Sequence, residues 1–147
     1  MRYILMAWLC LALPFSQDWM SDMSKAAAIA RDQKKLILLN FSGSDWCAPC
    51  VRLKKEILQS TEFGEAASSL VLVNADFPRN RKNQLSKEQQ QLNNELADRY
   101  NPEGKFPYTL LLNAEGKVLR AWDGFPSNGK TAFLEELKKQ SIQNAPK

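Results

Sequence analysis

The chain has 147 residues, of which 44% are hydrophobic and 24% charged, which is one domain's length and an ordinary globular composition. Its 20 Lys and Arg exceed its 16 Asp and Glu by only four, and these charges are mixed along the chain, which argues against a nucleic-acid-binding protein. The absence of histidine excludes Ser-His-Asp and Cys-His catalysis, c-type haem attachment and nearly all zinc sites with mixed Cys and His ligands.

Residues 1–16 have the pattern of an export signal. Arg2 precedes an apolar run over residues 3–13, which is too short for a comfortable membrane span and fits the apolar core of a signal peptide. We predict cleavage after Ser16, with Ala12 as a rival site and an uncleaved membrane anchor as the alternative. This pattern predicts a periplasmic or otherwise extracytoplasmic protein with one domain, residues 17–147.

The first half of this domain reads as helix, strand, helix. Residues 18–31 predict a helix that Ser21 or Asp22 can cap. Residues 36–41 form a continuous apolar run, which is typical of a strand in the centre of a sheet. A second helix is expected from the cysteine pair through Leu58, and residues 61–68 suit a further helical turn or two.

Between this strand and the second helix, residues 46–50 read Trp-Cys-Ala-Pro-Cys. Two cysteines three apart on a helix lie on one face, at a separation that suits a disulfide. Cys47, at the start of the helix, meets free backbone N–H groups and the positive end of the helix dipole, which favour the thiolate and lower the pKa of Cys47. Pro49 costs nothing in the first helical turn. We therefore predict a redox-active pair with a reactive Cys47 and a slower, resolving Cys50.

A metal site at this pair is the weaker interpretation. Once residues 1–16 are removed, Cys47 and Cys50 are the only cysteines, because Cys10 lies in the signal. Zinc would then need a dimer or carboxylate ligands. We predict no metal and no cofactor.

The second half of the domain alternates strands and helices and then ends in a hairpin and a helix. Leu85, Leu92 and Leu96 are spaced for one helix face. The expected order is strand 70–75, polar loop 77–83, helix 86–99, strand 108–112, turn 113–116, strand 117–122 and helix 131–140. This alternation predicts an α/β fold with a central mixed β-sheet flanked by helices.

Phe106 and Pro107 open the strand at 108–112. A proline at the start of a strand must find a use for its missing N–H donor. A cis Phe106–Pro107 bond would turn the chain sharply and bring it close to another loop. The backbone of Phe106 could then hydrogen-bond an extended substrate that lies across the cysteine pair.

The cysteine pair after a buried strand, together with Phe106-Pro107 before the hairpin, resembles the thioredoxin superfamily. Residues 41–47, 74–78 and 123–125 further resemble exported bacterial domains related to the C-terminal domain of the transmembrane disulfide reductant. The resemblance covers about residues 19–140. It implies a thioredoxin fold, a nucleophilic Cys47, a resolving Cys50, a cis Pro107 that helps to hold substrate, and Trp46 packed beside the site.

Two features depart from thioredoxins. The buried acid that lies beneath the second cysteine in thioredoxins corresponds to Asn40, and its partner lysine corresponds to Leu72. Because both are missing, the proton acceptor for Cys50 is open, with Asp45, Glu56 and water as candidates. The segment 77–91 is also longer than in a minimal thioredoxin and is a candidate for shaping partner choice.

We predict a monomeric enzyme that reduces protein disulfides and is recharged by a membrane-bound electron donor. The Ala-Pro between the cysteines is close to the Gly-Pro of reducing thioredoxins. Export to an oxidising compartment favours an isomerase or an oxidase instead. A third alternative is a non-catalytic module that binds a peptide in a groove around Trp46, Pro107 and Trp122.

Two further groups have weaker functional signals. The basic residues Arg79, Arg81 and Lys82 are interpreted as a solvated loop rather than a docking site for an acidic partner. Trp122 and Phe125 are interpreted as packing residues, with a place beside the cysteine pair as the alternative.

Overall fold

The computed structural model describes residues 17–147, so the predicted signal peptide lies outside the described residues. Strand β2 (Leu36–Ser42) is the centre of a five-stranded sheet, and all seven of its residues are buried. The strand order is β1-β3-β2-β4-β5, in which β1 (Trp19–Met20), β3 (Leu70–Asp76) and β2 are parallel. The hairpin of β4 (Tyr108–Leu112) and β5 (Val118–Asp123) pairs antiparallel to β2.

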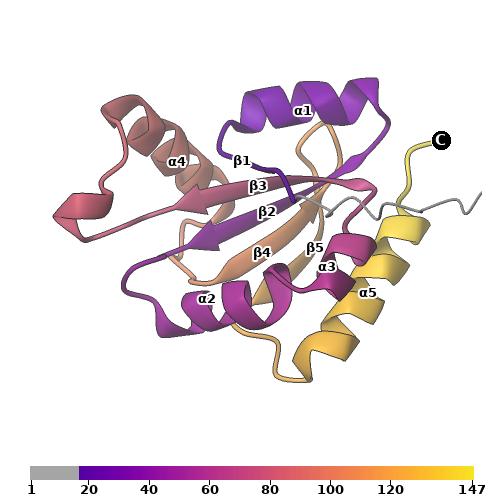
Figure 1. Cartoon of the computed structure of the whole chain (residues 1–147). Coiled ribbons are helices and arrows are strands. Elements are labelled where there is room, and N and C mark those ends of the chain that lie inside the picture. Colours follow the sequence, from indigo (N-terminus) through magenta and orange to yellow (C-terminus); the bar gives the residue numbers. More distant parts are fainter. Residues whose placement is uncertain (1–16) are drawn as a thin grey trace, which may run out of the picture.

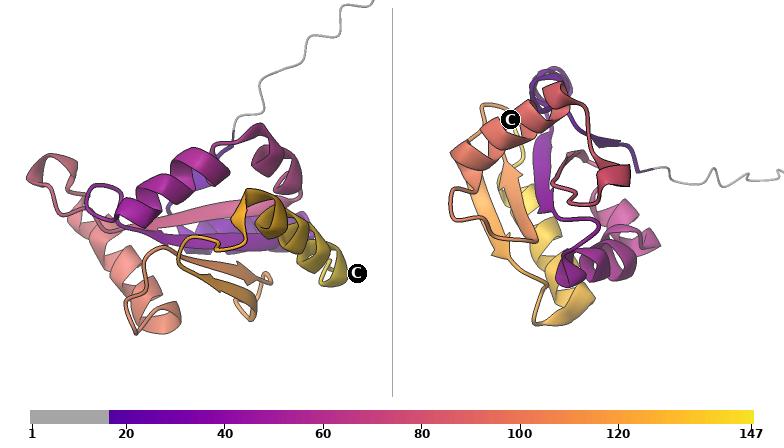
Figure 2. Two further views of the ribbon diagram at one scale, coloured as in Figure 1. Left: turned by 90° about the horizontal axis from the view of Figure 1, so that it is seen from below. Right: turned by 90° about the vertical axis from the view of Figure 1, so that its left-hand side faces the viewer.

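Helices cover both faces of this sheet (Figures 1 and 2). One core lies beneath α1 (Met23–Asp32) and α4 (Lys87–Tyr100), and the other beneath α2 (Ala48–Leu53), α3 (Thr61–Ala66) and α5 (Gly129–Gln143). Side chains alternate along β2, so Ile37 and Leu39 enter the first core, whereas Leu36 and Leu38 enter the second. This arrangement confirms the predicted α/β fold with a central mixed sheet flanked by helices.

Several element boundaries differ from the prediction for local reasons. Residues 19–20 belong to β1, which pairs with β3, so the first helix begins later than predicted and Asp22 is its N-cap. The helix that follows the cysteine pair changes at its second half into a π-helix, η1 (Lys54–Leu58). The loop after β3 contains a short 3-10 helix, η2 (Arg81–Asn83).

The predicted apolar face of α4 is wrong in part. Leu96 is buried, but Leu92 is 38% exposed. Asn93 takes the buried position instead, because its Nδ2 donates to the carbonyl of Asp76 at 2.8 Å and its Oδ1 accepts from Gln89 at 2.8 Å. Helix α4 is therefore held on the sheet by the buried Leu96 and by the amide of Asn93, which binds the end of β3.

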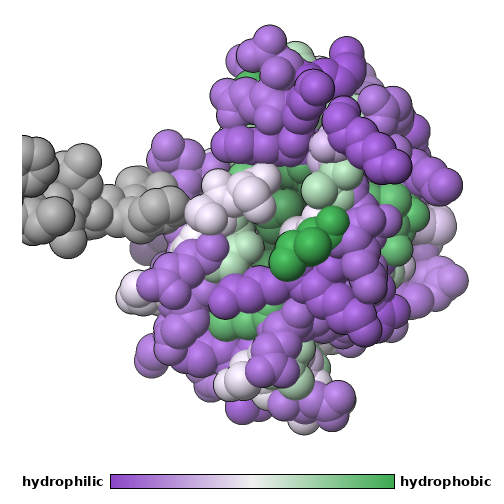
Figure 3. Space-filling view, turned by 90° about the vertical axis from the view of Figure 1, so that its right-hand side faces the viewer, coloured by the Kyte–Doolittle hydropathy of each residue, from purple (hydrophilic) through white to green (hydrophobic). Residues whose placement is uncertain are grey.

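The side of the molecule that carries the C-terminal end of α5 is mainly hydrophilic, with a small apolar area near its middle (Figure 3). Ile142 of α5 is 77% exposed. Within residues 17–147, no helix is long and apolar enough to cross a membrane.

Replacing Asp22 with alanine should destabilise the fold. Its Oδ1 accepts from the backbone N–H groups of Ser24 and Lys25 at 2.9 and 3.1 Å, which would otherwise lack a partner within the helix. We expect the free energy of unfolding in urea to fall by about 0.5–2 kcal/mol. Asp32→Ala, at the other end of α1, is the control, because an acid there opposes the helix dipole. An equal loss in both variants would contradict the capping role.

Candidate active site

The cysteine pair lies where the chain leaves β2 and enters α2. Cys47 is the N-cap of α2, and its Sγ accepts the backbone N–H of Cys50 at 3.3 Å. The two residues form a disulfide with a Cα–Cα distance of 5.2 Å, and both are buried. Pro49 occupies the first turn, where no N–H donor is needed. The structure therefore holds the pair in its oxidised form at the N-terminus of a helix, as the sequence predicted.

Trp46 links this pair to two other parts of the chain. Its Nε1 donates to the carbonyl of Phe77 at 2.7 Å, and its ring meets Phe106 edge to face at 5.3 Å between centroids. Phe77 in turn contacts Phe106 at 5.5 Å and Phe41 of β2 at 6.5 Å. An aromatic chain thus runs from the core to the residue that precedes Cys47.

The Phe106–Pro107 bond is cis, as the resemblance implied. The carbonyl of Pro107 accepts the N–H of Gly124 at 2.9 Å, which ties this loop to the end of β5. The contact between Trp46 and Phe106 brings this loop and the cysteine loop together at one end of the sheet. This end lies on the left of Figure 1 and faces the viewer in the right panel of Figure 2.

Asn101 fixes the loop before Phe106, a role that the sequence analysis missed. Its Nδ2 donates to the carbonyl of Lys105, and its Oδ1 accepts the N–H of Lys105, both at 2.8 Å. Asn101 is buried just after α4. The asparagine between a helix and Pro102 is a turn signal that could have indicated it. Hydrogen bonding to Glu103 and the nearby Asp123 raise the pKa of the half-buried Lys105 side chain.

An uncharged network occupies the place of the buried acid of thioredoxins. Asn40 donates to Asn74 Oδ1 at 3.0 Å and accepts from the hydroxyl of Thr109 at 3.0 Å. Leu72 lies in the adjoining core. A recess of about 560 Å³ opens beside this network, with Lys54 and Asp76 also in its wall. The buried polar groups are thus satisfied without an ionised pair.

The two carboxylates considered as proton acceptors for Cys50 are held by other groups. Glu56 accepts from Arg52 Nε at 2.9 Å on the exposed side of the helix. Asp45 accepts from Arg79 N, Asn80 N and Asn83 Nδ2 at 2.9, 2.8 and 3.1 Å. Water is therefore the remaining candidate of the three.

Asp45 therefore fastens the loop after β3 to the cysteine loop. The hydrogen bond from the Arg79 backbone is the main cause that lowers the pKa of Asp45, although burial opposes it. A carboxylate with a pKa below its unfolded value stabilises the fold above that unfolded value. This contribution is lost as the pH falls through the lowered pKa, so the attachment of the loop should weaken only in acid.

The basic loop is exposed, as predicted, but the side chain of Arg79 contacts a residue of the candidate site. Its guanidinium lies over the ring of Trp46 at 3.7 Å from the centroid. Arg52 makes a similar contact over Phe125 at 4.0 Å. Trp122 instead packs edge to face on Phe133 of α5 at 5.3 Å. Phe125 thus contacts the helix that carries Cys50, whereas Trp122 packs against α5, away from the contact between Trp46 and Phe106.

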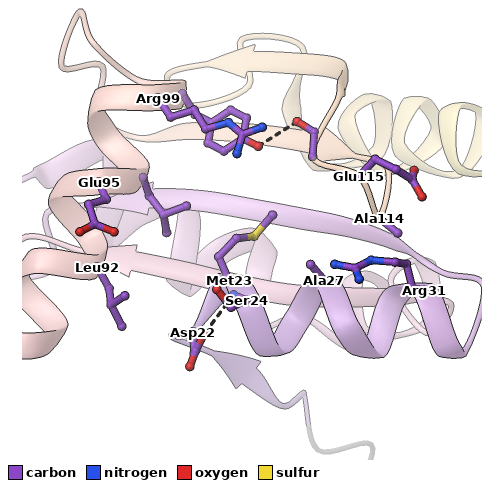
Figure 4. A pocket seen from close by; sticks show the side chains of 13 residues that line it. Asp22, Met23, Ser24, Ala27, Arg31, Leu92, Glu95, Arg99, Ala114 and Glu115 are labelled. Atoms are coloured by element: carbon purple, nitrogen blue, oxygen red, sulfur yellow. Dashed lines mark hydrogen bonds between the residues drawn. The ribbon is translucent and has the colours of Figure 1, made fainter.

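A second recess, of about 520 Å³, lies between α1, α4 and the turn before β5 (Figure 4). Arg31 and Arg99 approach it from different helices, with Glu95 and Glu115 also in its wall. Its charges are therefore mixed, and none of the predicted site residues lines it. Within the described part of the chain, no group of three or more Cys, Asp or Glu is placed to hold a metal ion.

Gly43→Ala should displace the Trp46 ring. A Cβ on Gly43 would overlap the indole, which its hydrogen bond to Phe77 and its contact with Phe106 hold in place. We expect a shifted and broadened indole N–H resonance of Trp46 in the NMR spectrum, with the peak assigned from Trp46→Phe. Gln143→Ala is the control, because Gln143 is exposed in the last turn of α5. An unchanged Trp46 resonance in Gly43→Ala would contradict this prediction, because it would show that the backbone at residue 43 accommodates the methyl group without moving the indole.

The fold and this pair define a thiol-disulfide oxidoreductase of the thioredoxin superfamily. The profile of the family described as thioredoxin-like matches residues 18–114, and the chain belongs to this family.

Proteins that are similar in sequence or in structure agree with this assignment. The disulfide bond reductase DsbH of Chlamydia pneumoniae is 40% identical over 116 residues, which are 78% of this chain and 68% of that protein. A solved structure titled DsbH oxidoreductase has a TM-score of 0.77 and 34% identity, and covers 91% of this chain and 92% of its own. The oxidised C-terminal domain of Neisseria meningitidis DsbD, with 20% identity and a TM-score of 0.52, shares the fold; the match covers 80% of this chain and 89% of that domain.

Proposed function

We propose that this chain is an exported disulfide reductase that works through Cys47 and Cys50. The observation that carries the proposal is the position of Cys47 at the N-cap of α2, where its sulfur accepts a backbone N–H. The same geometry stabilises a thiolate once the disulfide is reduced. Similarity to a protein named disulfide bond reductase supports the reducing direction.

The reaction uses the two thiols in sequence. The thiolate of reduced Cys47 attacks one sulfur of a substrate disulfide, forms a mixed disulfide and releases the other substrate sulfur as a thiolate that takes up a proton. Cys50 then loses its proton and attacks Cys47 Sγ, which releases the second substrate thiol. Two electrons and two protons pass to the substrate, and the enzyme is left with the Cys47–Cys50 disulfide found in this structure.

Three residues around the pair are proposed to hold the substrate. Trp46 and Phe106 form a contact that connects the cysteine loop with the proline loop. The backbone at Phe106 and Pro107 is proposed to bind an extended substrate segment. Phe77 contacts both aromatic residues and holds them in place. The N–H of Gly124 holds Pro107 by donating to its carbonyl. A rigid support of this kind lowers the entropy cost of substrate binding.

The proposed reductase activity requires protein substrates and an electron donor. Protein disulfides are the substrates, and an enzyme that reduces them must regain two electrons in each cycle. We propose a membrane-bound donor, an extracytoplasmic location after loss of residues 1–16, and a monomeric enzyme. The charged start and short apolar run in residues 1–16 support the extracytoplasmic location.

A pair of single-turnover reactions tests the direction. Reduced protein should open the disulfide of a peptide faster than oxidised protein closes the same peptide from its dithiol, as followed by mass spectrometry after acid quenching and alkylation. Faster closure would make the chain an oxidase, and shuffling of mismatched disulfides without net change would make it an isomerase. No exchange in either direction, with peptide binding retained, would make it a non-catalytic module.

A further inference from the structure

The loop after β3, residues 77–84, is held rigidly beside Cys47. Asp45, two residues before Cys47, accepts three N–H groups from this loop, at distances of 2.8 to 3.1 Å. Within the loop, Gln84 Nε2 donates to the carbonyls of Pro78 and Asn80 at 3.1 and 3.2 Å. The loop therefore has a fixed position relative to the nucleophile, although most of its residues are exposed.

The cationic groups of this loop have no acidic partner in the described residues. Arg79, Arg81 and Lys82 are exposed, and none of them forms an ion pair with a carboxylate in the described part of the chain. Arg52 provides the contrast on the other side of the pair. Its guanidinium also lies on an aromatic ring, but its Nε is bound to Glu56 at 2.9 Å. Of these two guanidinium groups, that of Arg79 is the one without a carboxylate partner in the described part of the chain.

The stacked geometry of Arg79 suits recognition of a carboxylate. The Arg79 Cζ is in van der Waals contact with the indole, at 3.7 Å from the centroid. A guanidinium stacked on a ring at this distance keeps N–H donors at its edge, where they can reach a partner. These donors match the two oxygens of a carboxylate in a bidentate pair. Because the ring already holds the side chain in place, little conformational entropy is lost when the pair forms.

Two acids that lie beside this loop do not compete for the Arg79 guanidinium. Asp45 directs its oxygens to donors of the loop, and Asp76 accepts from the backbone and hydroxyl of Ser44 at 2.9 and 2.6 Å. Trp46, on which Arg79 lies, directly precedes Cys47, so the Arg79 guanidinium lies next to the cysteine loop. A negative side chain near the substrate cysteine would therefore meet an unpaired cation in a fixed orientation.

We propose that Arg79 is a specificity-determining residue that selects protein disulfides with an Asp or Glu close to the attacked cysteine. The inference rests on the proposed reductase function and names a substrate class for that site. It also gives a role to the segment that makes this chain longer than a minimal thioredoxin.

Matched disulfide peptides test this inference. The peptides differ at one position beside the cysteine, which is Glu in one and Gln in the other. Each second-order rate constant with reduced protein is divided by that of the same peptide with dithiothreitol, which attacks as a thiolate as Cys47 does and has no other charged group. The effect of Glu on the peptide's own disulfide chemistry then cancels. We expect the normalised ratio of Glu to Gln to be about two to five for a single exposed ion pair. It should fall toward one as salt screens the charges.

Substitutions at Arg79 test whether this residue causes the preference for the Glu peptide. Arg79→Met keeps an apolar stem over Trp46 and should bring the ratio to about one, whereas Arg79→Lys, which keeps a charge without the planar fork, should retain part of it. Arg31→Met is the control for net charge, because Arg31 lies on α1 and lines the second recess. It should leave the ratio unchanged.

The outcomes separate this inference from the proposed function. A wild-type ratio of one, or a ratio that survives Arg79→Met, overturns the role of Arg79 while the reductase function stands. An equal loss in Arg31→Met would assign the preference to overall charge and would also overturn it. Failure to reduce either peptide would overturn the proposed function itself.

Discussion

Cys47→Ser should abolish disulfide exchange, with a loss of at least about a thousandfold in the rate, because the attacking sulfur is removed. Serine at the N-cap still accepts the backbone N–H of Cys50, so the fold should be retained. Rates are measured with a disulfide peptide under single-turnover conditions, and the fold is checked by circular dichroism.

Cys50→Ser is the matched variant for this experiment. It keeps the nucleophile but lacks the thiol that releases the substrate, so a mixed disulfide of Cys47 with the peptide should accumulate and be visible by mass. Substantial exchange by Cys47→Ser, or accumulation of a mixed disulfide on Cys50 instead of Cys47, would contradict the proposed order of the two thiols.

Phe41→Ala should produce a large loss of stability. Phe41 is fully buried in the central strand, and its ring contacts Phe77 and Tyr108 at 6.5 and 6.4 Å between centroids. Removing a buried aromatic side chain leaves a cavity in addition to the lost burial, so we expect the free energy of unfolding to fall by about 3–5 kcal/mol. Urea denaturation followed by circular dichroism measures this change.

Ile142→Ala is the control for this variant, because its side chain is largely exposed. Its effect should stay within about 0.5 kcal/mol. A loss below about 1 kcal/mol in Phe41→Ala would show that the neighbouring rings collapse into the space. The aromatic chain that supports Trp46 would then be more adaptable than the structure indicates.

Elements with a strong local pattern could be predicted from the sequence. The apolar run at 36–41 and the β-branched run at 70–75 became strands β2 and β3, each one residue longer than predicted. The strand at 108–112 has the predicted bounds, since Pro107 precedes it and a turn follows. The cysteine pair stands at the start of a helix, a position that Pro49 indicates because proline suits the first helical turn.

Features that depend on distant contacts could not be predicted. Strand β1 has two residues, too few for a periodic pattern, and exists through its pairing with β3. The π-helix after α2 shares the residue types of an ordinary helix. The contact of Arg79 with Trp46 requires the loop after β3 to be fastened by Asp45, which lies 34 residues away. A basic run in a polar segment gives no local sign of such a contact.

The reduction potential of the Cys47–Cys50 couple tests the central claim most directly. Equilibration in dithiothreitol or glutathione buffers, followed by alkylation, gives the fraction of reduced protein at each potential. The reductase account predicts a value near or below about −230 mV, in the range of thioredoxin and the more reducing glutaredoxins. A value of about −180 mV or higher, where isomerases and periplasmic oxidants lie, would contradict it and assign the chain to disulfide formation or shuffling.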